Sequence, residues 1–316
     1  MLKRKITNLF FCAVLTTIFF MFAVTSAFAV SVNGNISDSF TDVPVPNSIS
    51  GDGNGVVLMY HHIVPDEVYA SGIYAGNNAV IPVSQFEEEM LYLYENGYTT
   101  LKMSEVNTYI RNGMTLPDKT VVITFDDGYE SNYVYVYPIL QKYNLKANIA
   151  VVVISSLDEV SGSTGEFDAT KQTHLTFDQM REMQASGLVE IGSHSYDGHA
   201  YIKTVNSEYG KFFSQRKYLS ELGRSETYYE YFTRINDDLR LSKYILEREL
   251  GTVISYFAFP YGSFCDDAIK ALQYNGFEIA TTVNTGKISA ASNVFLLNRK
   301  NVNAGIDISQ FANLIN

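Results

Sequence analysis

Short apolar runs alternate with amphipathic segments from about residue 56 onward, and this pattern predicts strands and helices in turn. The apolar runs are rich in β-branched residues and end at glycine or polar residues, as buried strands do. We expect strands at residues 56–60, 98–101, 121–123, 147–154, 189–192, 253–259, 278–283 and 294–297. Apolar residues recur at helical spacing between them, and we expect helices at residues 84–96, 104–112, 132–143, 176–186, 235–250 and 266–275.

Strands and helices that alternate about every 30–45 residues predict βα units around a mainly parallel sheet. A count of about seven or eight strands favours a barrel, so the predicted fold class is α/β. Two helix starts carry a capping box, Ser84…Glu87 and Thr176…Gln179, in which both side chains satisfy amides of the first turn. Residues 200–233 are polar and aromatic without clear periodicity, so we interpret them as an insertion.

Residues 1–29 have the three parts of a signal peptide. Lys3, Arg4 and Lys5 form a basic start, residues 9–24 are apolar, and Ala27-Phe28-Ala29 is a cleavage signal. A retained membrane anchor is the alternative, but the apolar stretch is short for a span. We therefore expect a secreted, extracellular or cell-wall-associated protein with no stable transmembrane anchor after cleavage.

Residues 30–55 are rich in Ser, Asn, Asp, Gly and Pro, a composition typical of a flexible linker. Beyond residue 56 the chain has no convincing internal repeat and no second break in composition. We therefore expect a single catalytic domain at residues 56–316, behind an N-terminal extension, in a monomer.

The overall composition fits a globular protein, with 46% hydrophobic and 18% charged residues. Removal of residues 1–29 takes away three basic and no acidic residues, so the formal charge falls from −11 to −14. An acidic chain of this kind disfavours nucleic acid as a partner but is compatible with a neutral polymer or one that becomes cationic. Cys265 alone would remain, which excludes an internal disulfide.

Two adjacent acids, Asp126 and Asp127, come shortly after the apolar strand at residues 121–123 and precede Gly128. Functional groups of parallel α/β proteins collect where strands end. Adjacent carboxylates repel each other unless a cation or a shared proton intervenes. A turn stabilised by Asp side chains is the alternative interpretation of this segment.

A second polar cluster favours the metal interpretation. His194 and His199 lie in a small-residue loop after another predicted strand. Two imidazoles and one carboxylate form a ligand set for Zn²⁺ or another divalent metal, with positions left for water and substrate. The spacing alone leaves a catalytic and a structural metal open, but no Cys ligand is present. One acid could bind the metal while its neighbour takes a proton from water.

These segments resemble a known family. Residues 124–128, the His194…His199 loop and residues 259–262 are similar to the first three motifs of the polysaccharide deacetylases, carbohydrate esterase family 4 (the NodB homology domain). The resemblance covers roughly residues 117–300, and residues 59–61 and 86–98 resemble the N-terminal extension of secreted bacterial members. It implies a deformed (β/α)7-type barrel and metal-dependent removal of acetyl groups from N-acetylglucosamine residues of a polysaccharide.

The resemblance also implies residue roles. Asp126 would be the general base, and the backbone N–H of Tyr261 would help to hold the oxyanion. The implied ligands of a divalent metal, commonly zinc, with nickel or cobalt also used, are Asp127, His194 and His199. The residues expected to contact the substrate are Tyr196, Pro260 and Leu297.

The chain departs from the common family pattern at three places. Its histidines are five apart instead of four, which resembles the branch that acts on poly-β-1,6-N-acetylglucosamine of biofilms. Ala258 and Phe259 stand before Pro260, where an Arg that orients the base is usual. No His follows Leu297, so the general acid is not assigned; Arg299 is a poor proton donor at neutral pH.

Three alternatives stay open from the sequence. His61 or His62, which follow a predicted strand, could line the pocket or serve the core. The substrate could be peptidoglycan or chitin oligomers instead of a β-1,6-linked polymer. A protein of another class, a non-catalytic glycan-binding or matrix protein, could have kept the same fold.

Overall fold

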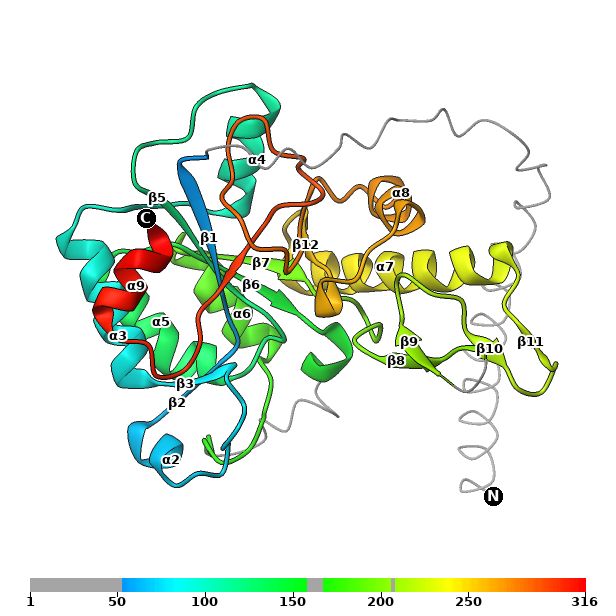
Figure 1. Cartoon of the computed structure of the whole chain (residues 1–316), viewed down its shortest axis with the longest axis horizontal. Coiled ribbons are helices and arrows are strands. Elements are labelled where there is room, and N and C mark those ends of the chain that lie inside the picture. The colour runs from blue at the N-terminus through cyan, green and yellow to red at the C-terminus, as the bar shows by residue number, and fades with distance from the viewer. Residues whose placement is uncertain (1–52, 158–166, 206–207) are drawn as a thin grey trace, which may run out of the picture. The chain divides into compact units, whose positions relative to one another are not determined.

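A parallel sheet that curls into a barrel forms the centre of the structure (Figure 1). The computed structural model describes residues 53–157, 167–205 and 208–316. Along the sheet the strands lie in the order β13 (Ile279–Thr281), β12 (Tyr256–Ala258), β7 (Val189–Ser193), β6 (Ala147–Val151), β5 (Thr120–Phe125), β1 (Gly55–Tyr60) and β14 (Lys300–Asn301). Each neighbouring pair is parallel, and β4 (Thr99–Thr100) pairs with the start of β5.

Residues 297–301 close the barrel. Leu297 forms a parallel bridge with Thr281 of β13, and its N–H donates to the Ala280 carbonyl over 3.0 Å. Three residues later Lys300 pairs with Leu58 of β1. The deformed (β/α)7-type barrel predicted from the sequence is thereby confirmed. The strand expected at residues 294–297 is wrong, because only Leu297 bridges and β14 begins at Lys300.

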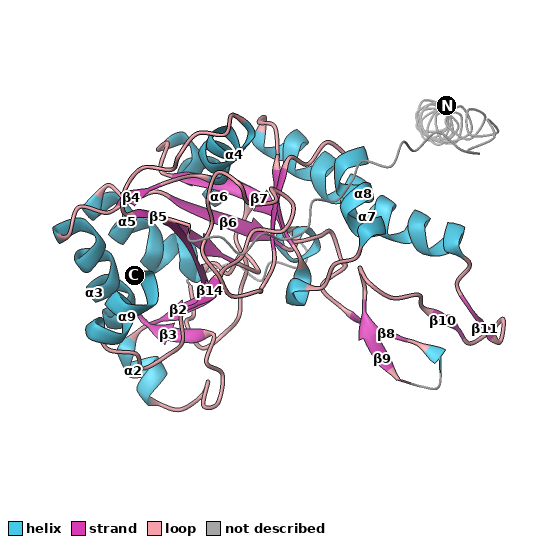
Figure 2. Ribbon diagram, turned by 45° about the horizontal axis from the view of Figure 1, so that its top comes forward, coloured by secondary structure: helices cyan, strands magenta, loops and turns pink. Residues whose placement is uncertain are grey.

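Helices cover the outside of the sheet (Figure 2). The longer ones are α3 (Val83–Glu95), α4 (Met103–Arg111), α5 (Tyr137–Tyr143), α6 (Phe177–Ala185), α7 (Tyr228–Leu250), α8 (Asp266–Tyr274) and α9 (Ile308–Ile315). The shorter elements at the start of the barrel are β2 (His62–Val64), α2 (Asp66–Ala70) and β3 (Val80–Pro82). A π-helical turn at Asn132–Val136 leads into α5.

Capping explains where the helices start. Thr176 and Gln179 form the predicted capping box of α6. The box expected at Ser84 is wrong, because α3 begins one residue earlier and the Ser84 hydroxyl donates to Asp66 instead. A capping box that was not predicted, Thr227 with Glu230, starts α7 at Tyr228, inside the segment interpreted as an insertion.

The inside of the barrel is apolar at its amino end, where the strands begin. Alternate strand residues form one buried cluster there, namely Val57, Val122, Ala150, Tyr256, Ala258 and Ile279. Helix α4 adds Met103, Val106 and Ile110 to the same cluster. Its first turn is fixed near the strand starts, where the Ser104 hydroxyl donates to Glu190 over 2.7 Å. The amino end of the barrel is therefore plugged, which leaves the carboxyl end for polar side chains.

The predicted signal peptide at residues 1–29 lies outside the described residues, and so does the predicted linker except for residues 53–55. Gly55 already belongs to β1. Within the described parts of the chain, no helix is long and apolar enough to cross a membrane.

Candidate metal centre

Asp127, His194 and His199 converge at the carboxyl end of the barrel. The Asp127 Oδ1 atom lies 3.6 Å from His194 Nε2 and 3.4 Å from His199 Nε2. One ligand atom from each residue lies within 4.8 Å of the others. Asp127 Oδ1 is buried and has no hydrogen-bond partner among the described residues. A carboxylate oxygen and two imidazole nitrogens at these distances fit one divalent ion.

Strained backbone positions aim the site residues. Asp127 has φ of 70°, Ser195 of 89° and Tyr261 of 57°, all in the left-handed region that non-glycine residues rarely adopt. Each follows directly on a strand or its extension, so the chain turns sharply where the strand ends. Such outliers concentrate at functional sites, where the surrounding structure holds them. Gly128 (φ 71°) continues the turn, and a Cβ there would lie 2.7 Å from Val151 Cγ1.

The His194 ring is oriented by the backbone of β12. Its Nδ1 lies 2.8 Å from the Ala258 carbonyl oxygen, so Nδ1–H donates and Nε2 keeps its lone pair toward Asp127. Burial lowers the pKa of His194 even though Asp126 and Asp127 act to raise it. The imidazole is therefore neutral near pH 7, the state that binds a metal.

Asp126 forms a buried, two-pronged ion pair with Arg299. The two Nη atoms of Arg299 donate to the two carboxylate oxygens of Asp126, each over 2.7 Å. Arg299 also donates from Nε to the Thr282 carbonyl, and its side chain is fully buried. The Arg that sequence reasoning did not find before Pro260 is thus supplied from the segment that closes the barrel.

Arg299 decides the charge state of Asp126. Burial by itself would raise the pKa of the carboxyl group, but the charge and the hydrogen bonds of Arg299 act to lower it. The pKa of Asp126 lies well below its usual range, so the group is ionised at any working pH. A fixed carboxylate beside the triad is the geometry that a general base needs.

The two consecutive histidines after β1 have different environments. His62 is buried, with Nδ1 2.8 Å from the Ser131 hydroxyl, and burial lowers its pKa to about 4. His61 continues the inward face of β1 beside Asp126, whose N–H donates to the Tyr60 carbonyl. The Nδ1 atom of His61 is buried without a hydrogen-bond partner among the described residues. His62 is therefore held in the core, whereas His61 lies near Asp126.

Asp238 of α7 holds the loop that carries both histidines. Its two carboxylate oxygens accept the N–H groups of Tyr196 and Asp197 over 3.0 and 2.8 Å. Burial raises the pKa of Asp238 to about 6, although these backbone hydrogen bonds act to lower it. The sequence carried one signal for it, since Asp238 falls on the same helix face as Ile235 and Leu239.

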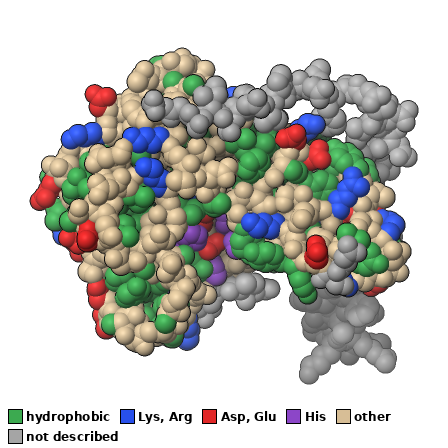
Figure 3. Space-filling model, viewed as in Figure 1, with side chains coloured by type: hydrophobic (Ala, Val, Ile, Leu, Met, Phe, Trp, Pro, Cys, Tyr) green, Lys and Arg blue, Asp and Glu red, His purple; other side chains and the backbone are tan. Residues whose placement is uncertain are grey.

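A pocket of about 230 Å³ opens beside the triad. Asp127, His199 and Asp197 form its polar side, and Val152 and Ile154 belong to its apolar lining. Figure 3 shows histidine and acidic side chains at the bottom of a hollow in this face. Tyr129 also lines the pocket, where burial and then the nearby Asp127 carboxylate raise the pKa of its hydroxyl.

The remaining predicted residues lie around the triad. The Tyr261 ring packs on His199, with ring centroids 4.3 Å apart. Tyr196 is half-buried in the histidine loop, and Pro260 is buried. Leu297 is fully buried in the core cluster inside the barrel. Substrate contacts of these residues stay a prediction.

Comparisons with known proteins agree with this geometry. A family model described as polysaccharide deacetylase matches residues 113–280. Poly-β-1,6-N-acetyl-D-glucosamine N-deacetylase of Escherichia coli (strain K12) is 30% identical over 243 residues, which are 75% of this chain but only 35% of the relative's length. Putative polysaccharide deacetylase YxkH of Bacillus subtilis (strain 168) is 28% identical and is covered over 74% of its length, with 81% of this chain.

A solved de-N-acetylase structure from Aggregatibacter actinomycetemcomitans matches with a TM-score of 0.69 at 28% identity, over 82% of this chain and 99% of that one. A curled parallel barrel with an Asp–His–His cluster beside a second carboxylate defines a class of hydrolytic enzymes. The chain belongs to the polysaccharide deacetylase family.

Proposed function

We propose that the protein is a secreted, metal-dependent N-deacetylase that removes acetyl groups from poly-β-1,6-N-acetylglucosamine. One observation carries the proposal: Asp126, locked by Arg299, lies beside the triad Asp127, His194 and His199. The name of the Escherichia coli relative and the five-residue histidine spacing support the β-1,6-linked polymer. Zinc is the expected ion, and nickel or cobalt would suit the same donors.

The proposed mechanism is hydrolysis of the acetamide. A divalent ion held by the triad would supply Lewis acidity toward water and the acetyl carbonyl oxygen. Asp126 takes a proton as water attacks the carbonyl carbon, and the Tyr261 N–H donates to the oxyanion. The C–N bond then breaks, which gives acetate and a free sugar amine once the nitrogen has gained a proton.

His61 is our candidate for the donor of that proton. It directly follows β1, as Asp126 directly follows the paired strand β5, and it is close enough to Asp126 to act on the pKa of that carboxyl group. Its buried Nδ1 has no partner among the described residues, so no protein hydrogen bond occupies this ring nitrogen. Histidine can donate a proton near neutral pH, which Arg299 cannot.

His61→Gln is expected to lower kcat for acetate release by about 10²-fold, because general acid catalysis is lost. The matched control is His62→Gln, which removes the neighbouring histidine from the core and should cost stability while most of kcat per folded protein remains. Both are measured as rate against pH, with the folded fraction checked by circular dichroism. Equal losses of kcat in the two variants would contradict the role of His61.

The proposed function is tested by acetate release from purified poly-β-1,6-N-acetylglucosamine, peptidoglycan and chitin oligomers, with metal-loaded and chelated protein. We expect the fastest release from the β-1,6-linked polymer and none after chelation. The chelated protein should stay folded, because protein hydrogen bonds already hold His194 and the loop after it. Faster release from peptidoglycan or chitin would identify that polymer as the substrate instead. Binding without release would indicate a non-catalytic glycan-binding protein.

A further inference from the structure

A two-stranded hairpin beside the metal centre carries an exposed face of tyrosines and lysines. Its strands are β8 (Tyr201–Lys203) and β9 (Tyr209–Lys211), and they pair antiparallel. Tyr201 lies opposite Lys211, and Lys203 lies opposite Tyr209, so the four side chains share one face. Tyr201 is 56% exposed and Tyr209 is 76% exposed. Tyr201 and Tyr209 are diagonal neighbours on this face, and their rings are too open to water to serve the core.

This face continues from the metal centre. The Tyr201 and Tyr261 rings lie 4.8 Å apart, and Tyr261 in turn packs on the ligand His199. The Lys211 ammonium donates to the Tyr261 carbonyl over 3.2 Å. Rings thus follow one another from the metal ligand outward to the hairpin. A polymer with one residue at the triad would bring its neighbouring residues over these rings.

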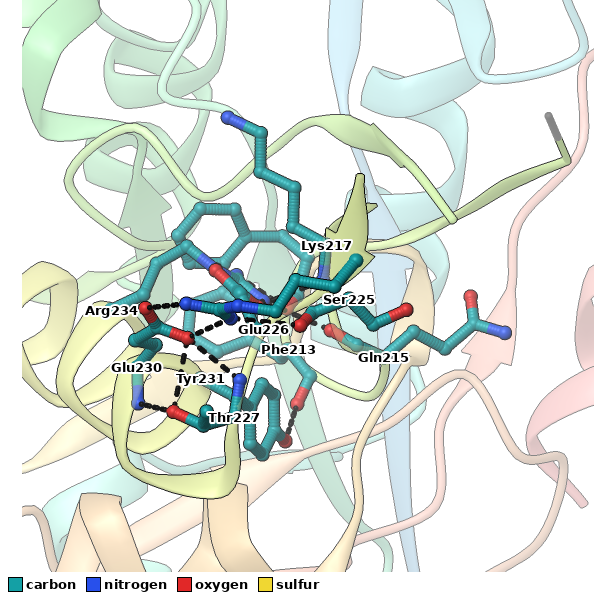
Figure 4. Close-up of polar contacts among 11 residues, drawn as sticks. Phe213, Gln215, Lys217, Ser225, Glu226, Thr227, Glu230, Tyr231 and Arg234 are labelled. Atoms are coloured by element: carbon teal, nitrogen blue, oxygen red, sulfur yellow. Dashed lines mark hydrogen bonds and ion pairs between the residues drawn. The ribbon is translucent and has the colours of Figure 1, made fainter. Parts of the chain in front are cut away.

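The hairpin belongs to an arm, residues 200–205 and 208–227, that is anchored on α7 (Figure 4). Arg234 pairs with the buried carboxylate of Glu226 over 2.8 and 2.9 Å. The same guanidinium donates to the Phe212 and Gln215 carbonyls, each over 2.9 Å. A buried charge with several backbone partners fixes the base of the arm, so its exposed face is held in place before a ligand binds.

The charge of the arm differs from that of the whole chain. Residues 200–227 hold five basic and three acidic residues, a formal charge of +2 in a chain of −11. A tyrosine ring offers an apolar face to a sugar ring, and a lysine can donate to its hydroxyl and acetyl oxygens. A deacetylated sugar carries an ammonium group, which the lysines repel. The face therefore suits neutral, still acetylated residues better than the reaction product.

We propose that the exposed face of Tyr201, Lys203, Tyr209 and Lys211 is an accessory subsite for N-acetylated sugar residues that flank the residue at the metal centre. The proposal rests on the proposed function, since the occupant is the same glycan chain whose acetyl group enters the pocket. The lysines give the subsite its preference for stretches that are not yet deacetylated.

Tyr209→Ala tests the rings, because Tyr209 lies at the far end of the face from the metal centre. The matched control is Tyr274→Ala, which removes a ring of 69% exposure at the end of α8. Each variant is assayed on the fully acetylated polymer and on a small aryl acetate that fills only the pocket. We expect Tyr209→Ala to lower kcat/KM about five- to tenfold on the polymer and to leave the small ester unchanged. Tyr274→Ala should change neither.

Lys203→Glu tests the preference for acetylated residues. Wild type is expected to act faster on the fully acetylated polymer than on a half-deacetylated one, and Lys203→Glu should narrow that ratio several-fold. An unchanged polymer-to-ester ratio in Tyr209→Ala, or an equal loss on both substrates, would overturn the subsite. Absence of acetate release by metal-loaded wild type from every N-acetylated substrate would instead refute the proposed function.

Discussion

Asp126→Asn is expected to lower kcat/KM for acetate release by about 10²–10⁴-fold while one divalent ion stays bound. The amide cannot accept the proton of water, yet none of the three ligands is altered. The adjacent variant Asp127→Asn should instead lose bound metal, because it removes a ligand atom and weakens the metal site itself. Metal content after gel filtration and acetate release, measured on the same samples, separate the two carboxylates.

The two roles would be contradicted by either of two results. If Asp126→Asn lost its metal, Asp126 would be a ligand; if it kept full activity, it would not be the base. Both assays need the folded fraction, since Asp126→Asn leaves Arg299 buried without its full carboxylate partner. Loss of activity that exceeds the loss of folded protein is the meaningful quantity.

Much of the barrel and the triad could be predicted from the sequence. Apolar runs of five or six residues marked β1, β5 and β6, and the polar residues just after β5 and β7 proved to share one end of the barrel. This works because parallel strands present their carboxyl ends at one edge, and because side chains alternate. The positions at which the strands end therefore suffice to place Asp126 and His194 at that edge.

The pairing of Arg299 with Asp126 was not predicted from the sequence, for two reasons. Arg299 directly precedes β14, which has only two residues and is too short to show periodicity. Its partner Asp126 is 173 positions away, so no local pattern links the two. One signal did exist: Leu297 points into the barrel, and alternation places Arg299 on the same side. The resemblance directed attention to the third motif, where the chain has Ala258.

The arm was equally hard to predict, because its strands are two or three residues long and pair only with each other. The start of α7, however, could have been predicted from the sequence. Thr227 and Glu230 form a capping box, but the aromatic residues at 228–232 hid the helical period behind it. Sequence patterns identify elements that bury one face, and the arm exposes its tyrosines instead.

Arg299→Met should have the largest effect on stability. The guanidinium and the Asp126 carboxylate are both buried, so removal of one partner leaves a charge in an apolar interior. We expect the free energy of unfolding at pH 7 to fall by about 3–5 kcal/mol. The double variant Asp126→Asn with Arg299→Met removes both charges and should recover part of that loss, which chemical denaturation can measure. A double variant less stable than Arg299→Met would contradict the ion pair as the cause.

The same substitution should reverse how stability depends on pH. In wild type the pKa of Asp126 lies below its ordinary value of 3.8, so the pair stabilises the fold above that pH and the contribution is lost as pH falls through the folded pKa. Without Arg299, burial dominates and the pKa of Asp126 rises above 3.8. Stability attributable to Asp126 is then present in acid and declines as pH rises. The difference in the free energy of unfolding between wild type and Arg299→Met should therefore be larger at pH 7 than at pH 4.

The acid limb of kcat/KM should also move to higher pH in Arg299→Met. Arg299→Lys retains the charge without the paired hydrogen bonds, so its acid limb should lie between those of wild type and Arg299→Met. An acid limb shared by all three proteins would exclude Arg299 from control of the base.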